Sequence, residues 1–459
     1  MYKDKSASGV LAYADDIVVW APAPELLHDL INMVVDKGGE IGLSLNLNKC
    51  KTMTRSSIRM PNITTCPMDD VEEFTYLGIR CTTEPGVNFL MTDLDYRCGT
   101  LFNSMMENVR KTLGFHYGSL HTRLMLSKAL VTSKIFYGQE LWPNSSAVKK
   151  IVEKDLMVIA CQLLGIRTLK PCYKVVVAEA GFDNPDLTRM KKQIDIGIHW
   201  DYDLEDTPIN LILSRSKDCA SDKVWAYYGY RHTMDQYNMN NCQIGDECRL
   251  ANGDIDYDAE EQAFLNWRCR MLDYLAQQYA SQEPEPRIDS TERKYFKEQI
   301  TRNDFWQCLM HLSGYPYGRR CLHEVRCMCY PVIAYRCRVG WKALESSRCL
   351  FCETGEDETL EHMTCRCPAW DTVRKTYLDS YCRFGRKLMM KIVLGYVYTP
   401  VEEARIRDQG FEEQVIVNDI TRFLQNVDRR RSDILKGLGL DITSRTTNRG
   451  GIRQRRRLN

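Results

Sequence analysis

Three cysteines and one histidine in the C-terminal part of the chain constrain its fold more than any other feature. They follow the spacing C-x2-C-x9-H-x4-C, formed by Cys349, Cys352, His362 and Cys367. Three thiolates and one imidazole suit a closed tetrahedral site for structural zinc (Zn2+), in which a short C-x2-C turn presents two sulfurs and a helix supplies the second pair. Thr359 is the expected N-cap of that helix, and Pro368 is expected to end the segment.

Other cysteines compete with this interpretation, because the chain contains 20 of them. Cys365 offers the alternative spacing H-x2-C for the fourth ligand. A second site that includes His323 is a further, weaker alternative. We interpret the nearby thiols as buried groups, since a large chain in a reducing compartment is not expected to form a disulfide framework. These thiols are Cys321, Cys327, Cys329 and Cys337.

The charge balance limits what the chain can bind. Lys and Arg total 62, Asp and Glu total 61, and the net charge is +1, so any attraction to nucleic acid must come from local basic surfaces. No stretch approaches the ~18 consecutive apolar residues of a membrane span, and we expect no membrane partner. The first residues, MYKDKSASG, lack the apolar core of a secretory signal, so we expect a cytoplasmic or nuclear protein. The oligomeric state cannot be derived from the sequence.

The start of the chain predicts a β-hairpin that carries two neighbouring carboxylates at its tip. Asp15 and Asp16 stand between the β-rich runs Val10–Tyr13 and Ile17–Trp20. Carboxylate oxygens bind Mg2+, and two such ions can clamp the attacking and leaving oxygens of a phosphoryl transfer. Asp is also common in ordinary turns, so the pair alone does not decide between a metal site and a turn.

A helix and a strand are expected after this hairpin. Apolar residues from Leu26 to Val35 recur with the rhythm of one buried helix face. Gly38, Gly39 and Gly42 are expected to end the helix, and Leu43–Leu47 alternates like a strand.

Three sequence boxes in this region resemble the palm of reverse transcriptases from non-LTR (LINE-type) retrotransposons. Residues 13–16 match the YADD box, residues 42–49 match the GLxxNxxK segment, and residues 74–78 match the FxYLG box. Residues 358–362, followed by Cys367 and Pro368, resemble the "ETxEH…CP" zinc knuckle that lies C-terminal to many of these enzymes. That resemblance favours Cys367 over Cys365 as the fourth ligand.

The resemblance implies roles for individual residues. Asp15 and then Asp16 are the implied ligands of catalytic Mg2+, and Lys49 is implied to help pyrophosphate to leave. A primer-grip role is implied for Tyr76, Leu77 and Gly78. Enzymes of this family also need an upstream metal-binding aspartate and fingers, whereas only 12 residues precede Tyr13. We therefore expect a C-terminal fragment of an RNA-directed DNA polymerase that is inactive alone, with Mg2+ as an ancestral cofactor that does not function in this chain.

Two alternatives remain open. The chain is either a non-catalytic, zinc-containing protein that binds nucleic acid, or a decayed remnant without function. Both the polymerase-fragment hypothesis and the hypothesis of a non-catalytic nucleic-acid-binding protein imply the same partners. These partners are an RNA template and a DNA primer or target.

Two basic regions are candidates for contact with phosphates, although solvated helix faces and a solubilising tail are equally reasonable. The first lies in helices that resemble a thumb and end in the segment Tyr137–Trp142, where a YGxExW ending is frequent in the family. Its members are Arg110, Lys111, Arg123, Lys128 and Lys134. The second is the C-terminal tail, with Arg453, Arg455, Arg456 and Arg457.

The predicted fold class is α+β, with a small palm remnant followed by mostly helical regions and a small zinc knuckle. Six segments are predicted. They are a palm remnant (1–85), a helical thumb-like region (86–200), a helical and loop region of unknown role (201–320), a CCHC knuckle region (321–371), a C-terminal helical region (372–439) and a basic tail expected to be disordered (440–459). A linker at 281–286 is expected before an amphipathic helix at 290–312.

Overall fold

A computed structural model gives the fold of the protein. It describes residues 8–46, 49–54, 68–83, 89–112, 118–142, 145–166, 171–202, 226–237, 239, 257–282, 303–340, 344 and 346–440. These residues form mainly helices together with three two-stranded sheets, in agreement with an α+β class. No helix in that part of the chain is long and apolar enough to cross a bilayer.

The chain divides into two compact units, which are described separately. The first comprises residues 1–101, 135–149 and 189–276, and the second comprises residues 102–134, 150–188 and 277–459. Four helices contain residues of both units: α5 (Ser133–Ile135), α6 (Ser146–Leu164), α8 (Pro185–Tyr202) and α11 (Tyr257–Gln282).

The first unit begins with the predicted hairpin. Strands β1 (Gly9–Tyr13) and β2 (Asp16–Trp20) are antiparallel, and Tyr13 stands opposite Asp16. Ala14 and Asp15 therefore form a two-residue turn, in which Ala14 has a φ of 54°, as tight hairpin turns require. Helix α1 (Pro24–Glu40) follows and contacts β2. The predicted helix is therefore confirmed, but its predicted buried face is not, since none of its residues is fully buried.

The end of α1 agrees with the prediction in part. The helix runs through Gly38 and Gly39 and ends at Glu40, just before Gly42, which has a positive φ of 80°. The Leu43 N–H donates to the Gly38 carbonyl over 2.8 Å. The strand predicted at Leu43–Leu47 is wrong for residues 43–46, which form no strand, and residue 47 lies outside the described residues. Alternating apolar residues need a neighbouring strand to pair with, and residues 43–46 have none.

Two further small sheets follow in the first unit. Strands β3 (Lys51–Thr52) and β4 (Asp69–Asp70) pair in parallel, and β5 (Glu73–Tyr76) pairs antiparallel with β6 (Ile79–Thr82). Helix α2 (Phe89–Tyr96) packs against β6 and continues into the π-helix η2 (Arg97–Leu101). The unit also contains the 3-10 helix η4 (Gln139–Leu141) and α10 (Ala226–Gln236), which contact each other.

The first unit is thinly packed at its start. Of the described residues between 8 and 83, none is fully buried. Large apolar side chains are exposed there, including Leu11, Tyr13, Met33, Ile41 and Leu43. A two-stranded hairpin with one helix buries too little apolar surface to be strongly stable by itself.

The second unit is built from helices. Their bounds are α3 (Phe102–Thr112), α4 (Leu120–Ser127), η3 (Lys128–Thr132), α7 (Tyr173–Glu179), α13 (Asp304–His311), α14 (Pro316–Arg326), α15 (Ile333–Arg338), η6 (His362–Arg366), η7 (Pro368–Trp370), α16 (Asp371–Tyr377), α17 (Asp379–Cys382), α18 (Arg386–Leu394), α19 (Pro400–Arg407) and α20 (Glu413–Gly437). The predicted helix at 290–312 is described only from residue 303, where α13 covers 304–311.

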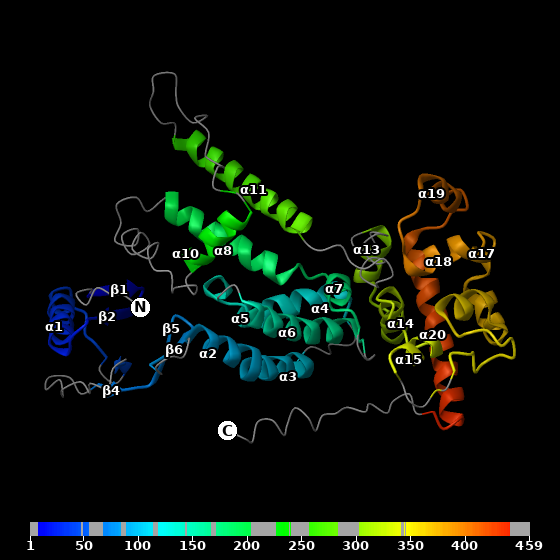
Figure 1. Ribbon diagram of the computed structural model, residues 1–459, viewed down its shortest axis with the longest axis horizontal. Helices are drawn as coiled ribbons and strands as arrows, with labels where there is room; N and C mark the ends of the chain where they lie inside the picture. The colour runs from blue at the N-terminus through cyan, green and yellow to red at the C-terminus, as the bar shows by residue number, and fades with distance from the viewer. Residues whose placement is uncertain are drawn as a thin grey trace. The chain divides into compact units, whose positions relative to one another are not determined.

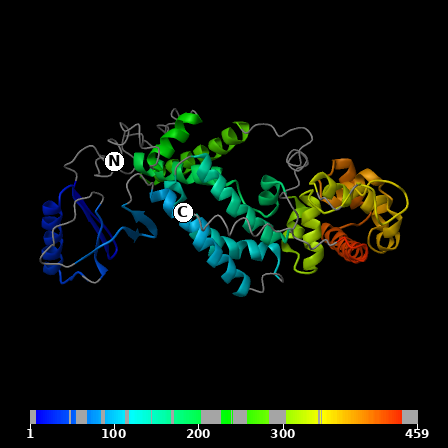
Figure 2. The same ribbon diagram turned by 60° about the horizontal axis from the view of Figure 1, so that its bottom comes forward.

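Helix α20 is the centre of the second unit. It packs against α13, α14 and α16, and Figures 1 and 2 both show it beside α14. Ile420, Phe423 and Leu424 are fully buried on its inner face. The helices α14 and α20 approach most closely at Gly318, where a Cβ would lie 2.4 Å from the Thr421 carbonyl oxygen. Any other residue at position 318 would therefore push the two helices apart.

Candidate metal centre and aspartate hairpin

The structure brings the four predicted zinc ligands together in the second unit. The ligand atoms of Cys349, Cys352, His362 and Cys367 all lie within 4.8 Å of one another. The Cys349 and Cys367 sulfurs are 3.9 Å apart, and the Cys352 sulfur lies 3.4 Å from His362 Nε2. Around a tetrahedral zinc ion the corresponding separations are about 3.8 Å and about 3.6 Å, from the usual Zn–S and Zn–N bond lengths. The cluster therefore fits zinc in donor type and in spacing.

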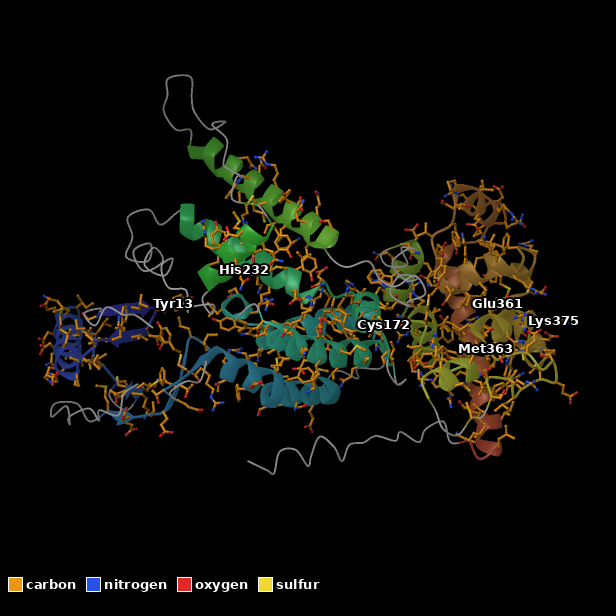
Figure 3. All side chains as sticks on the ribbon, in the orientation of Figure 1. Tyr13, Cys172, His232, Glu361, Met363 and Lys375 are labelled. Atoms are coloured by element: carbon orange, nitrogen blue, oxygen red, sulfur yellow. The ribbon has the colours of Figure 1, made fainter. Side chains whose placement is uncertain are left out.

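Local backbone structure positions these ligands. Residues 347–358 fold back on themselves, because the Cys349 N–H donates to the Glu356 carbonyl over 2.8 Å and Arg348 pairs antiparallel with Asp357. The helical segment that follows has Thr359 as its N-cap, as predicted, since the Thr359 hydroxyl accepts the His362 N–H over 3.1 Å. The Cys367 N–H then donates to the His362 carbonyl over 2.7 Å. Figure 3 labels Glu361 and Met363, the sequence neighbours of His362.

A carboxylate orients the histidine. Glu356 lies 2.9 Å from His362 Nδ1, and the same carboxylate pairs with Arg366 at 3.0 Å. This contact leaves Nε2 to face the sulfurs, which is the usual arrangement of a metal-binding histidine. The hydrogen bond to His362 is the main reason that the pKa of Glu356 lies below its ordinary value. The sequence analysis missed Glu356, although its position six residues before the histidine was visible.

The thiols of Cys349 and Cys367 shift each other's pKa in opposite directions. Hydrogen bonding to Cys367 lowers the pKa of Cys349 to about 5, and the backbone N–H of Phe351 also stabilises that thiolate. The pKa of the Cys367 thiol is raised, mainly by the same contact with Cys349. A thiolate is the form of cysteine that binds metal, so the lowered pKa of Cys349 favours the metal-binding form of that residue.

The competing cysteines lie outside the cluster. Cys365 is not part of it, and burial raises the pKa of the Cys365 thiol to about 11. Of the four nearby thiols, Cys321, Cys327 and Cys329 are buried as expected. Cys337 is only half-buried, because it lies at the end of α15, and its thiol contacts the Ser346 carbonyl at 3.3 Å.

The second metal site considered for His323 is not found among the described residues. The only Cys and His cluster there is the one around His362. His323 is fully buried and instead pairs with Glu179, with 2.9 Å between Nδ1 and the carboxylate.

The aspartates of the first unit stand at the tip of the hairpin. Asp15 lies in the turn, Asp16 begins β2, and both are exposed. Figure 3 labels Tyr13, which ends the preceding strand. Within the part of the chain that is described, no third carboxylate, histidine or cysteine joins them in a cluster. Two exposed carboxylates do not complete a magnesium site, which needs near-octahedral oxygen coordination, so the described residues alone do not fit this ion.

Lys49 is exposed and stands just after the loop that follows α1. Its backbone N–H donates to the Asn46 carbonyl over 2.9 Å. The structure assigns no contact between Lys49 and the aspartates.

The YLG box forms a tight turn, and the side chain of Arg97 supports it. Leu77 and Gly78 have positive φ values of 45° and 79°, and Tyr76 stands opposite Ile79. Arg97 donates to the Gly78 carbonyl and to Asp93, with 2.6 Å between Arg97 Nε and the Asp93 carboxylate.

A second support comes from the segment 137–142. A Cβ at Gly78 would lie 3.2 Å from the Tyr137 ring, and the Arg97 guanidinium lies 5.5 Å from the centre of the same ring. The FxYLG box (residues 74–78) therefore lies against the segment Tyr137–Trp142. Asp93 and Arg97 were missed by the sequence analysis, although an acid and a base four residues apart on a helix are a recognisable pair.

The basic thumb-like residues do not form one surface. Arg123 is buried, which contradicts its predicted place on a phosphate-binding surface, and burial lowers its pKa to about 10. Lys128 is half-buried with its ammonium 6.0 Å from the centre of the Phe182 ring, whereas Lys134 is exposed. The side chains of Arg110 and Lys111, which belong to α3, are not described. The tail residues Arg453, Arg455, Arg456 and Arg457 lie outside the described residues.

Comparison with known proteins agrees with the family resemblance. Residues 2–81 match the family described as reverse transcriptase (RNA-dependent DNA polymerase). An uncharacterized transposon-derived protein of Caenorhabditis elegans is 27% identical over 163 residues, which are 34% of this chain and 56% of that protein. The chain thus matches about half the length of this relative. No solved structure matches the chain. The two matches support the reverse transcriptase family and a relationship to transposable elements.

Proposed function

We propose that this chain is part of the reverse transcriptase of a non-LTR, LINE-type retrotransposon. The observation that carries the proposal is the agreement of three features within residues 2–81: the family match, the hairpin with Asp15 and Asp16 at its tip, and the tight YLG turn. In this proposal Asp15 and Asp16 are two of the ligands of the catalytic metal, and Lys49 assists the departing pyrophosphate. Tyr76, Leu77 and Gly78 belong to the surface that holds the primer.

We propose further that the chain as given binds nucleic acid without extending a primer. Two exposed carboxylates do not complete a two-metal site for phosphoryl transfer. A third carboxylate and a template-holding region would have to come from outside the described residues. The partners proposed for this chain are an RNA template and a DNA primer or target, in the cytoplasm or the nucleus.

Zinc has a structural role in this proposal. Bound zinc would supply a cross-link between the folded-back segment at Cys349 and Cys352 and the helical segment at His362 and Cys367. The chain's own contribution is a set of thiolates, together with a histidine whose orientation is fixed by Glu356. All four positions of a tetrahedral ion are filled by protein, which is typical of a structural rather than a catalytic zinc site.

A second candidate function is a non-catalytic, zinc-containing protein that binds nucleic acid. One observation favours it. The metal cluster belongs to the second unit, whereas the hairpin with Asp15 and Asp16 belongs to the first. The two candidates differ in whether the aspartates of the hairpin contribute to any activity of the chain.

Primer extension on the full chain distinguishes these functions. Purified protein is incubated with an RNA template, a DNA primer and deoxynucleotides, with Mg2+ or Mn2+, and its binding to the same template and primer is measured in parallel. We expect binding without extension, and equal binding by Asp15→Asn. Extension that is abolished by Asp15→Asn would show an active polymerase and overturn the proposed inactivity. Failure to bind any nucleic acid would overturn both candidate functions.

A further inference from the structure

Helix α20 carries an exposed row of polar residues that the zinc cluster and the hairpin do not explain. Arg422, Asn426 and Arg429 are spaced i, i+4 and i+7, so they lie along one face of the helix. Both arginines are exposed and Asn426 is half-buried, whereas Phe423 and Val427 on the inner face are fully buried. We call these three residues the arginine ridge.

Tyrosines flank the arginine ridge on both sides. The Arg422 guanidinium lies 5.0 Å from the centre of the Tyr315 ring and donates from Nε to the Tyr315 hydroxyl over 2.8 Å. The Arg429 guanidinium lies 6.0 Å from the centre of the Tyr317 ring, also near the start of α14. On the side of α16, the Tyr377 hydroxyl accepts from Asn426 over 3.4 Å. Half-buried tyrosine side chains therefore lie directly beside the cationic groups of the arginine ridge.

The charge of the ridge is not neutralised within the described part of the chain. Neither Arg422 nor Arg429 comes within ion-pair distance of a carboxylate there. The neighbouring arginines are different: Arg320 pairs with Asp428 at 3.1 Å, and Arg431 pairs with Glu358 at 2.7 Å. Those pairs are largely buried, and they join α20 to α14 and to the segment that carries the metal ligands. The two ridge arginines keep guanidinium donors that face water.

This combination fits a flexible polyanion with flat bases. A guanidinium offers paired donors that match phosphate oxygens, and bases stack on tyrosine rings and on guanidinium planes. A duplex hides its base faces, so a surface that offers stacking partners favours single strands. Asp433, one turn beyond Arg429 on α20, would repel a phosphate and limits the ridge at that end.

We propose that the arginine ridge and its flanking tyrosines form a binding surface for single-stranded nucleic acid. The proposal deepens the function proposed above, on which it rests, by naming the surface and the form of the ligand. Arg422 and Arg429 contact phosphates, Tyr315 stacks a base, and Asn426 is available to a base edge. RNA and DNA share this chemistry, and the experiment distinguishes them.

The test measures affinity and its salt dependence by fluorescence anisotropy with the full, zinc-loaded chain. The probes are an oligouridine and an oligothymidine of roughly 16 nucleotides, and a DNA duplex of the same length. Arg422→Gln with Arg429→Gln removes two phosphate contacts, so the log–log salt slope on single strands should flatten by about 1.4, at roughly 0.7 per contact. Tyr315→Leu should weaken binding by about five- to hundredfold through lost stacking, and Tyr315→Phe should keep most of the affinity.

The matched control removes the same charge elsewhere in the second unit. Arg405 and Arg407 are exposed arginines on α19, and Arg405→Gln with Arg407→Gln should leave affinity and slope within about twofold of the unchanged protein. Circular dichroism and thermal unfolding verify that each variant is folded. A variant that is not folded is replaced by Arg422→Lys with Arg429→Lys, which keeps the charge, loses the paired donors and should bind with reduced affinity at an unchanged slope.

Each outcome is informative. Equal loss in the ridge variant and the α19 variant would mean that only overall charge matters and would overturn the proposed surface. Unchanged binding by the ridge variant would overturn it as well, while leaving the proposed function intact. Preference for the duplex over both single strands would contradict the form of ligand proposed. If the unchanged protein binds none of the probes, the proposed function fails together with the surface.

Discussion

Arg431 and Glu358 form a buried two-point ion pair that joins helix α20 to the segment carrying the metal-ligand cluster. Arg431 Nε donates to one carboxylate oxygen over 2.7 Å and Nη2 donates to the other over 2.8 Å. The Arg431 side chain is 2% exposed and that of Glu358 is fully buried. Glu358 also accepts the Ile333 N–H over 2.7 Å, so α15 is held by the same carboxylate.

Breaking this pair on one side should destabilise the second unit strongly. Glu358→Ala leaves the buried Arg431 charge with only Asp428, 3.8 Å away, as an ion-pair partner, and a loss of about 3–5 kcal/mol in the free energy of unfolding is expected. The double replacement Glu358→Leu with Arg431→Met removes both charges and should recover much of that loss. Chemical denaturation followed by circular dichroism measures both. Equal stability of Glu358→Ala and the unchanged protein would show that the ion pair does not hold α20 in place.

The metal cluster makes a separate prediction about stoichiometry. About one zinc per chain should co-purify, and Cys352→Ser, His362→Ala and Cys367→Ser should each remove it, because a closed tetrahedral site needs all four ligands. Cys365→Ser and Cys382→Ser are matched controls outside the cluster and should retain zinc. Elemental analysis of the purified variants gives the answer. Zinc retained by Cys367→Ser and lost from Cys365→Ser would mean that the fourth ligand is Cys365.

Much of the candidate metal site could be predicted from the sequence because its ligands are close in the chain. The spacing of Cys349, Cys352, His362 and Cys367 determines a local structure, and the Thr359 cap is local as well. Glu358 was recognised only as part of a motif. Its partner Arg431 stands 73 residues away, and no periodicity links the two.

The remaining features depend on tertiary packing. Arg123 was predicted to lie on a basic helix face, yet it is buried and close enough to Arg319 of α14 for that charge to lower its pKa further. Leu43–Leu47 has the alternation of a strand, but a strand forms only where a neighbouring strand is available. The hairpin at Asp15 was predicted correctly because a two-residue turn is determined locally. The turn at Leu77 and Gly78 is equally local, but the sequence pattern was interpreted only as a family box.

The support of the YLG turn predicts a local rather than a global effect. Arg97→Met removes the donors to the Gly78 carbonyl and to Asp93, and leaves a buried carboxylate without this partner. The turn should open more often, with a loss of about 1–3 kcal/mol in the local opening free energy. Hydrogen exchange at the amides of β5 and β6 measures it.

Arg80→Gln is the control for this variant. It removes a partly exposed ion pair with Glu73 on the same sheet, which should matter much less. Unchanged protection of β5 and β6 in Arg97→Met would contradict the role given to Arg97.

The last prediction concerns acid sensitivity of the second unit. Glu179 is fully buried, and burial alone would raise its pKa, but Arg326 and His323 overcome that effect and lower the pKa from 4.5 to about 2. Arg326 Nε lies 2.8 Å from the Glu179 carboxylate and His323 Nδ1 lies 2.9 Å from it. Burial also lowers the pKa of His323 below 6.5, so its ring stays neutral further into acid than it does in the unfolded chain.

Both shifts act in the same direction. The unfolded chain takes up protons at His323 below about pH 6.5 and at Glu179 below about pH 4.5, before the folded protein does, so the free energy of unfolding falls as the pH falls. The Glu179 contribution is fully present above about pH 4.5 and is lost toward pH 2, and it amounts to about 3 kcal/mol. Glu179→Gln should reduce stability at neutral pH and make the unfolding free energy less dependent on pH between 5 and 3, as measured by denaturant titration at each pH. If the variant and the unchanged protein lose stability equally over that range, the acid sensitivity comes from other carboxylates, and the ion pair of Glu179 with Arg326 is not its source.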